Sequence, residues 1–155
     1  MSTPSLVKYE NYTEYLEHYK REYCRKTIYT SDNIRVYFSE SRFWHAFYKG
    51  KHKNNIFDTK RAQYIDWIRY ILESKSAILF QGYCSDTKSM KAHRRVAVVS
   101  ENKYVVVIEM YFNSKKTLCA KFITAYYADK SYPKIIQSPK WDMNECVEYL
   151  KQKRG

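Results

Sequence analysis

The apolar residues of this chain change their spacing near residue 76, and this change constrains the fold more than any other feature. Before it, they recur at helical intervals over residues 11–26, 39–49 and 59–73. After it, runs rich in β-branched and aromatic residues predict strands at 77–83, 95–99, 104–111 and 117–127. A short alternating strand at 34–38 and a closing helix at 142–152 complete the pattern.

The links between the four later strands are short and polar. Short links favour antiparallel pairing, because a parallel crossover needs about a dozen residues or more. The pattern therefore predicts an α+β fold, in which N-terminal helices pack on a small antiparallel β-sheet (a meander) and a C-terminal helix follows.

The length of 155 residues suits one domain. We expect an N-terminal helical extension over 1–32, a central core over 33–141 and the C-terminal helix over 142–155. No apolar run reaches the roughly 18 residues that span a membrane, and the first residues lack the apolar stretch of a signal peptide. We therefore expect a cytoplasmic protein that does not bind membranes.

The cysteines are scattered along the chain, at Cys24, Cys84, Cys119 and Cys146, and form no CxxC pair. This spacing predicts free thiols, no metal site and no cofactor.

The first helix presents a stripe made mostly of tyrosine, with Tyr12, Tyr15, Leu16, Tyr19 and Tyr23 on one face. Since a phenol has an apolar ring and a polar tip, we expect this helix to pack at a hydrated boundary of the core.

The net charge is +12, and almost all of the excess lies in residues 49–61, 88–103 and 114–121. Basic segments that converge attract a polyanion, and a nucleic acid is the partner we expect. Ordinary solubilising charge is the alternative. The side chains we assign to nucleic-acid binding are Arg42, Lys49, Lys51, Lys53, Lys60, Lys91 and Lys121.

The helix at 39–49 carries Arg42, His45 and Lys49 on the side away from Phe43 and Phe47. Neighbouring cations lower the pKa of an imidazole, and an arriving phosphate raises it again. His45 is therefore a candidate for proton transfer beside a phosphodiester. The alternative is a partly exposed histidine without a function.

The strand at 117–127 offers further candidates. Simple alternation places Thr124 and Tyr126 on one face, together with Leu118, Ala120 and Phe122. Their two hydroxyls could hold a phosphate or a 2′-OH, although both residue types are also ordinary strand formers.

The basic run His93-Arg94-Arg95 enters the second strand of the meander. Adjacent strand residues point to opposite faces, so only one of the two arginines can serve a common cleft. Glu109 lies in the middle of the third strand and is either a catalytic carboxylate or a structural ion-pair partner.

Several segments together resemble a known group of nucleases. FSESRFWHAFYKG, FDTKRAQYIDWIRYIL, RRVAVV, YVVVIEM and KFITAYYAD occur in that order. They resemble the phage and mobile-element branch of the barnase/EndoU/colicin/RelE-like (BECR) nuclease fold, over about residues 36–141.

The resemblance implies a metal-independent ribonuclease, frequently a toxin that an acidic antitoxin or immunity protein neutralises. By position it implies a site composed of His45, Arg61, Arg94 or Arg95, Thr124 and Tyr126. Such enzymes use the 2′-OH of the RNA as nucleophile and leave a 2′,3′-cyclic phosphate. The alternative function is a non-catalytic module of a phage or mobile element that binds single-stranded nucleic acid or a protein partner.

Overall fold

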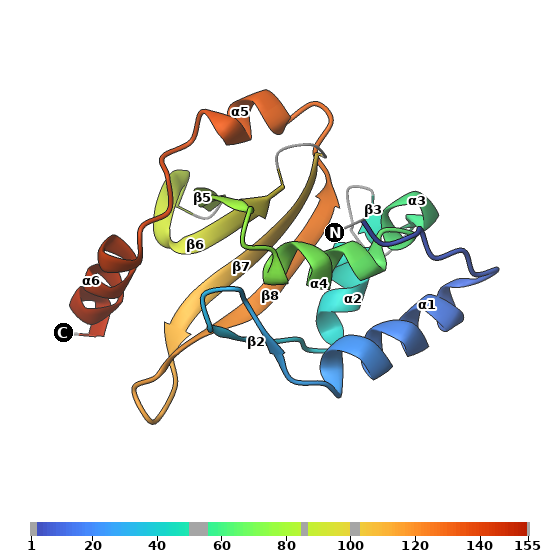
Figure 1. Ribbon diagram of the computed structural model, residues 1–155, viewed down its shortest axis with the longest axis horizontal. Coiled ribbons are helices and arrows are strands. Elements are labelled where there is room, and N and C mark those ends of the chain that lie inside the picture. The colour runs from blue at the N-terminus through green and yellow to red at the C-terminus, as the bar shows by residue number, and fades with distance from the viewer. Residues whose placement is uncertain (1–2, 50–55, 85–86, 100–102, 155) are drawn as a thin grey trace.

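The computed structural model describes residues 3–49, 56–84, 87–99 and 103–154 (Figure 1). Its helices are α1 (Tyr12–Tyr19), the π-helical turn η1 (Lys20–Cys24), α2 (Ser41–Ala46), α3 (Thr59–Ala62), α4 (Ile65–Glu73), α5 (Tyr132–Ile136) and α6 (Met143–Arg154). Its strands are β1 (Ile28–Tyr29), β2 (Arg35–Tyr37), β3 (Tyr48–Lys49), β4 (Ile56–Phe57), β5 (Ile78–Cys84), β6 (Ser89–Val98), β7 (Tyr104–Phe112) and β8 (Leu118–Tyr127).

The main sheet has six strands in the order β1-β2-β8-β7-β6-β5. Its β5–β8 half is an antiparallel meander, as the short links predict. The expectation of a wholly antiparallel sheet is wrong, because β2 runs parallel to β8. The chain between these two strands contains α2, α3, α4 and β5–β7, so it is long enough for a parallel crossover.

The sheet has two covered faces. We call inner the face of Ala120, Phe122 and Ala125, which belongs to a core cluster with residues of α1, α2, α4 and α6. We call outer the face of Val107 and Ile123, which packs against side chains of α5. In Figure 1, helices α1–α4 gather at the right of the sheet, α6 lies at its left end and α5 lies above it, and α6 shares the inner face with α1, α2 and α4. The order of the helices around the sheet therefore differs from the expected arrangement.

The tyrosine stripe of α1 and η1 is buried more deeply than expected. Tyr15, Tyr19 and Tyr23 are at most 2% exposed. Their hydroxyls donate to the backbone carbonyls of Val7, Ser39 and Ile65, respectively. Because these bonds satisfy the phenols without water, these three tyrosines lie inside the core rather than at a hydrated boundary. Tyr12 is 42% exposed and remains at the surface.

The predicted alternation along β8 fails at one residue. Val107 pairs with Thr124 while Ile108 pairs with Phe122, so Ile123 is an extra residue in the ladder. This β-bulge exchanges the faces of the strand. Phe122 therefore faces the inner core, whereas Thr124 and Tyr126 border a pocket on the outer face.

The predicted helix at 59–73 is divided. Asp58 caps α3 by accepting a hydrogen bond from the Arg61 backbone N–H at 3.0 Å. The chain turns at residues 63–64 and α4 begins at Ile65. The short elements β1, β3, β4 and α5 are additions that sequence periodicity did not predict, because two to five residues are too few to show a period.

Candidate active site

Three of the side chains predicted for catalysis line one pocket on the outer face. Arg94 of β6 and Thr124 and Tyr126 of β8 border a cavity of about 300 Å³ between the sheet and α5. Residues far apart in the sequence thus meet through the pairing of β6, β7 and β8.

Arg61 of α3 contacts Tyr126 but does not itself line the pocket. Its guanidinium carbon is 5.6 Å from the centroid of the Tyr126 ring, a cation–π arrangement. Its Nη1 donates to the carbonyl of Ala46 at 3.1 Å, and its Nε is 3.8 Å from the Asp58 carboxylate. Contacts to α2 and to the cap of α3 therefore hold this cation beside β8.

Tyr126 borders the pocket, and its hydroxyl is a hydrogen-bond donor there. Burial raises its pKa, while a hydrogen bond with Ser131 and the charge of Arg61 partly lower it. Since the net direction is upward, the phenol is protonated at neutral pH. Tyr126 can therefore donate a hydrogen bond or a proton to an oxygen in the pocket.

His45 is half-buried on α2. It directly precedes Ala46, the residue whose carbonyl accepts from Arg61. The helix that carries this imidazole is therefore tied to one of the predicted catalytic cations. Its role in proton transfer stays a prediction.

The two adjacent arginines of β6 are clearly separated by the structure. Arg95 is 2% exposed and forms an ion pair with Asp32, with Nη1 2.9 Å from Oδ2. Its guanidinium also lies 4.8 Å from the ring of Trp141, a residue of the inner core cluster. Arg94 borders the outer pocket, so we assign Arg94 and not Arg95 to the site.

Arg94 belongs to a charged row across three strands. It pairs with Glu109 of β7, which in turn pairs with Lys121 of β8. The Glu109 carboxylate is 3.0 Å from Arg94 Nη2 and 3.4 Å from Lys121 Nζ. Burial raises the pKa of this carboxyl, but the Arg94 hydrogen bond and the nearby cations outweigh it, so the pKa is lowered. Glu109 is thus an ionised partner of Arg94 and Lys121.

His93 is a candidate that the sequence analysis did not assign to the site. Its Nε2 is 3.5 Å from Glu109 Oε1, and its ring stacks on Tyr149 of α6 at 4.7 Å. The β6–β7 ladder ends at the pair Arg94–Glu109, and His93 lies just beyond this pair. In the sequence, only the position of His93 next to Arg94 pointed to the site. Regular strand alternation would direct His93 and Arg94 to opposite faces, and therefore His93 away from Glu109, the residue opposite Arg94.

The predicted nucleic-acid-binding residues are spread over the molecule. Lys91 lies 5.8 Å from the Tyr149 ring, near His93, and Lys121 adjoins Glu109. Lys49 of β3 and Lys60 of α3 are exposed, and Arg42 is half-buried on α2. Lys51 and Lys53 lie outside the described residues.

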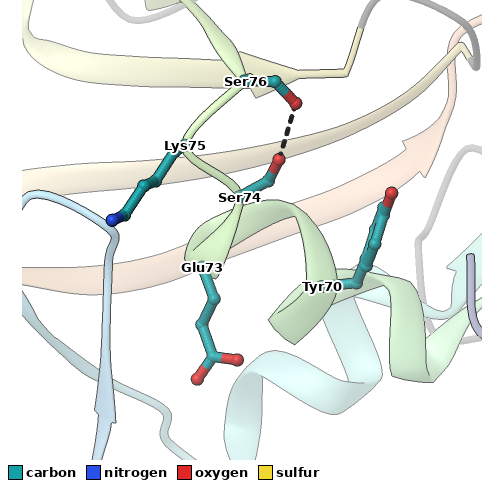
Figure 2. A pocket seen from close by; sticks show the side chains of 5 residues that line it. All are labelled: Tyr70, Glu73, Ser74, Lys75 and Ser76. Carbon is teal, nitrogen blue, oxygen red and sulfur yellow. Dashed lines mark hydrogen bonds between the residues drawn. The ribbon is translucent and has the colours of Figure 1, made fainter. Parts of the chain in front are cut away.

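A larger pocket, of about 530 Å³, lies away from these residues at the turn from α4 to β5. Figure 2 shows that the Glu73 carboxylate and the Lys75 amine point in different directions, while Ser74 and Ser76 bond each other at 3.0 Å. Its charged groups do not converge on a common ligand, so we do not place the chemistry there.

Within the described residues, no group of three or more His, Cys, Asp or Glu side chains is arranged to hold a metal ion. None of the described helices combines the length and apolar character that crossing a membrane requires. Comparison with protein-family models, with curated proteins and with solved structures gives no match to this chain.

Proposed function

We propose that this protein is a metal-independent ribonuclease that cleaves RNA through its own 2′-OH and leaves a 2′,3′-cyclic phosphate. One observation carries the proposal. Three residues predicted for this chemistry, Arg94, Thr124 and Tyr126, border one pocket on the outer face of the sheet, and the predicted cation Arg61 lies 5.6 Å from the Tyr126 ring.

The reaction needs two proton transfers and a cationic surround. A base takes the 2′ proton, O2′ attacks phosphorus, the P–O5′ bond breaks, and an acid protonates O5′. Tyr126 borders the pocket and its phenol is protonated at neutral pH, so we give it the role of supplying the proton to O5′. A neutral imidazole accepts the 2′ proton, and we give this role to His45.

The remaining groups bind the phosphate. Arg61 and Arg94 carry planar, permanently charged guanidinium groups that match phosphate oxygens. The Thr124 hydroxyl holds an oxygen of the phosphate or the 2′-OH. The charge of Arg61 beside the ring also stabilises the phenolate that proton donation leaves on Tyr126.

The decisive experiment incubates the purified protein with total RNA and with synthetic oligonucleotides in EDTA, and identifies the new termini. We expect 2′,3′-cyclic phosphate ends. Replacing His45→Ala or Tyr126→Phe should reduce the rate about 10²-fold or more, as loss of a general acid or base does. Absence of cyclic phosphate on every RNA tested would overturn the proposal.

Two matched variants act as controls. Tyr127→Phe alters the adjacent tyrosine, which is 46% exposed, and should leave the rate unchanged. His93→Ala removes the other imidazole near the site, and circular dichroism checks that each variant is folded. A folded His45→Ala variant with the parent's rate, together with an inactive His93→Ala variant, would transfer the proton-accepting role to His93.

A second candidate function is a non-catalytic module that binds single-stranded nucleic acid. It is favoured by lysines that lie over exposed or half-buried aromatic rings, as Lys134 does over Tyr83 at 5.7 Å and Lys103 over Tyr132 at 5.8 Å. Such a module would bind RNA and leave its termini unchanged, so the same experiment separates the two functions.

A ribonuclease of this kind would be a toxin of a phage or mobile element, acting on cellular RNA in the cytoplasm. Its basic face would require an acidic antitoxin or immunity protein that covers the pocket. Inducible expression in bacteria should then arrest growth, and the Tyr126→Phe variant should relieve the arrest. Growth arrest that is equal for both proteins would contradict the toxin proposal.

A further inference from the structure

The pocket beside Arg94 has a floor that suits a flat ring. Val96, Val107 and Ile123 of three neighbouring strands form one apolar surface, and Ile135 of α5 borders it from the other side. The volume of about 300 Å³ is at the lower end of the range of small-molecule sites. A single heterocycle fits this space, whereas a duplex does not.

Polar side chains line the pocket around this apolar floor. Besides Thr124, which the proposed reaction uses, the polar residues Gln81, Ser131 and Ser138 border the pocket. Amide and hydroxyl groups of this kind can bond the nitrogen and oxygen atoms at the edge of a nucleobase. The Gln81 amide already donates to Glu145 and the Ser138 hydroxyl to the Lys134 carbonyl, so these two side chains offer a ligand their acceptor oxygens. Acceptors beside an apolar floor favour a flat ring that carries N–H groups at its edge.

The rim adds a stacking ring and positive charge. Tyr83 of β5 is 51% exposed and borders the pocket, and Lys134 of α5 has its Nζ 5.7 Å from the centroid of the Tyr83 ring. Arg94 is also close to this residue, with Nη1 3.4 Å from the Tyr83 backbone carbonyl oxygen. An exposed aromatic ring with two cations nearby is suited to a base and its flanking phosphates.

We propose that this pocket binds one unpaired base of single-stranded RNA, with Tyr83 stacking on an adjacent base and Lys134 on the neighbouring phosphate. The inference rests on the proposed function for the identity of the polymer and adds the class of substrate. A base held in a duplex cannot reach the floor, so paired RNA is excluded.

Binding of the full chain to 2′-fluoro oligonucleotides tests this without cleavage, because these lack the 2′-OH. We expect a 12-nucleotide single strand to bind at least tenfold more tightly than the same sequence in a duplex. Tyr83→Ala should weaken the single strand about fivefold or more, within the usual effect of losing a stacking ring. Tyr29→Ala is the matched control, because Tyr29 is 48% exposed on β1 at the opposite edge of the sheet.

Two further measurements address the pocket itself. Ile135→Trp, which fills it from α5, should weaken binding as Tyr83→Ala does. An abasic strand with the same number of phosphates should bind at least tenfold more weakly than the parent strand. Equal binding of the abasic strand or of the duplex would overturn the inference, and would mean that the rim binds any polyanion, an acidic peptide included.

The outcomes for the pocket and for the ribonuclease are separate. Base-dependent binding without cyclic phosphate would keep the pocket and refute the ribonuclease. Cyclic phosphate formed as readily from a strand with abasic nucleosides would keep the ribonuclease and refute the pocket.

Discussion

At the scale of single residues, Arg94 and Arg95 show how neighbours in the chain acquire different tasks. Arg95 is enclosed with Asp32 and Trp141, whereas Arg94 lies at the outer pocket with its charge balanced by Glu109. A permanently charged guanidinium is stable in both places because each has a carboxylate partner. Only Arg94 keeps access to a ligand.

The first residue-scale prediction concerns Gly82. A Cβ at this position would lie 2.4 Å from Cγ and 2.9 Å from Cδ of Arg94, so the arginine stem must move. Gly82→Ala should destabilise the fold by about 1–3 kcal/mol, as overpacking does. It should also lower RNA cleavage, because Arg94 loses its position.

Urea denaturation and cleavage rates measure these two effects. The control is the same change in an Arg94→Ala background, where the two closest atoms, Cγ and Cδ of Arg94, are absent. Similar destabilisation in both backgrounds would show that the contact with Arg94 is not the cause.

The second residue-scale prediction concerns the pH dependence of His93. Burial has the largest effect and lowers the pKa of His93. The Glu109 carboxylate raises this pKa, and the cations Lys153, Arg94 and Lys91 lower it, so the net direction is downward. Folding therefore favours the neutral imidazole. In the unfolded chain His93 has the ordinary histidine pKa of about 6.5 and takes up its proton at a higher pH than in the folded protein. This contribution to the free energy of unfolding is present at pH 7 and declines towards pH 5.

His93→Gln should make the free energy of unfolding less dependent on pH between pH 7 and 5, and denaturation at several pH values measures this. Glu109→Gln has the opposite expected effect, because removal of the carboxylate lowers the His93 pKa further and steepens the decline. An unchanged slope in both variants would contradict the assignment.

At the scale of elements, the Arg95–Asp32 pair joins β6 to the turn between β1 and β2. Arg95 is almost wholly buried, so loss of its partner leaves a charge without compensation. Asp32→Ala should destabilise the protein by about 2–3 kcal/mol, less than for a fully buried pair because the Asp32 side chain is 36% exposed.

Thermal or urea unfolding tests this prediction. Glu73→Ala is the control, since it breaks the exposed Arg69–Glu73 pair at the end of α4 and should change stability by no more than about 0.5 kcal/mol. The double change Asp32→Ala with Arg95→Met should restore part of the loss. Equal effects of Asp32→Ala and Glu73→Ala would contradict a structural role for the pair.

At the scale of the whole molecule, the basic residues are distributed along the sheet rather than gathered at one point. Lys60 and Arg61 belong to α3, where Arg61 contacts the Tyr126 ring. Further along the sheet, Lys121 pairs with Glu109 and Lys91 lies over the Tyr149 ring. A strand of RNA that followed β8 would meet both groups.

Such a path predicts a strong salt dependence. The affinity for the 2′-fluoro strand should fall with salt, and Lys60→Ala and Lys91→Ala should each reduce the log–log slope by about 0.7, the value for one phosphate contact on a single strand. Lys26→Ala is the control, because Lys26 is paired with Glu22 at 2.6 Å. A slope that neither lysine changes would place the RNA elsewhere.

The sequence by itself determined the local features of this protein. The α+β class, the antiparallel meander β5–β8 and the concentration of charge follow from periodicity, short links and composition, which depend on nearby residues. It also placed Thr124 and Tyr126 on a common face, because side chains two residues apart in a strand point to the same face.

The tertiary structure alone decided what depends on distant contacts. The bulge at Ile123 set the face that Thr124 and Tyr126 share, and the parallel pairing of β2 with β8 needed the whole chain between them. Arg95 is buried in an ion pair with Asp32, whereas Arg94 lies at the pocket, and residues of α5 form one wall of that pocket. Local patterns cannot supply these results, because each comes from the packing of segments that the sequence keeps far apart.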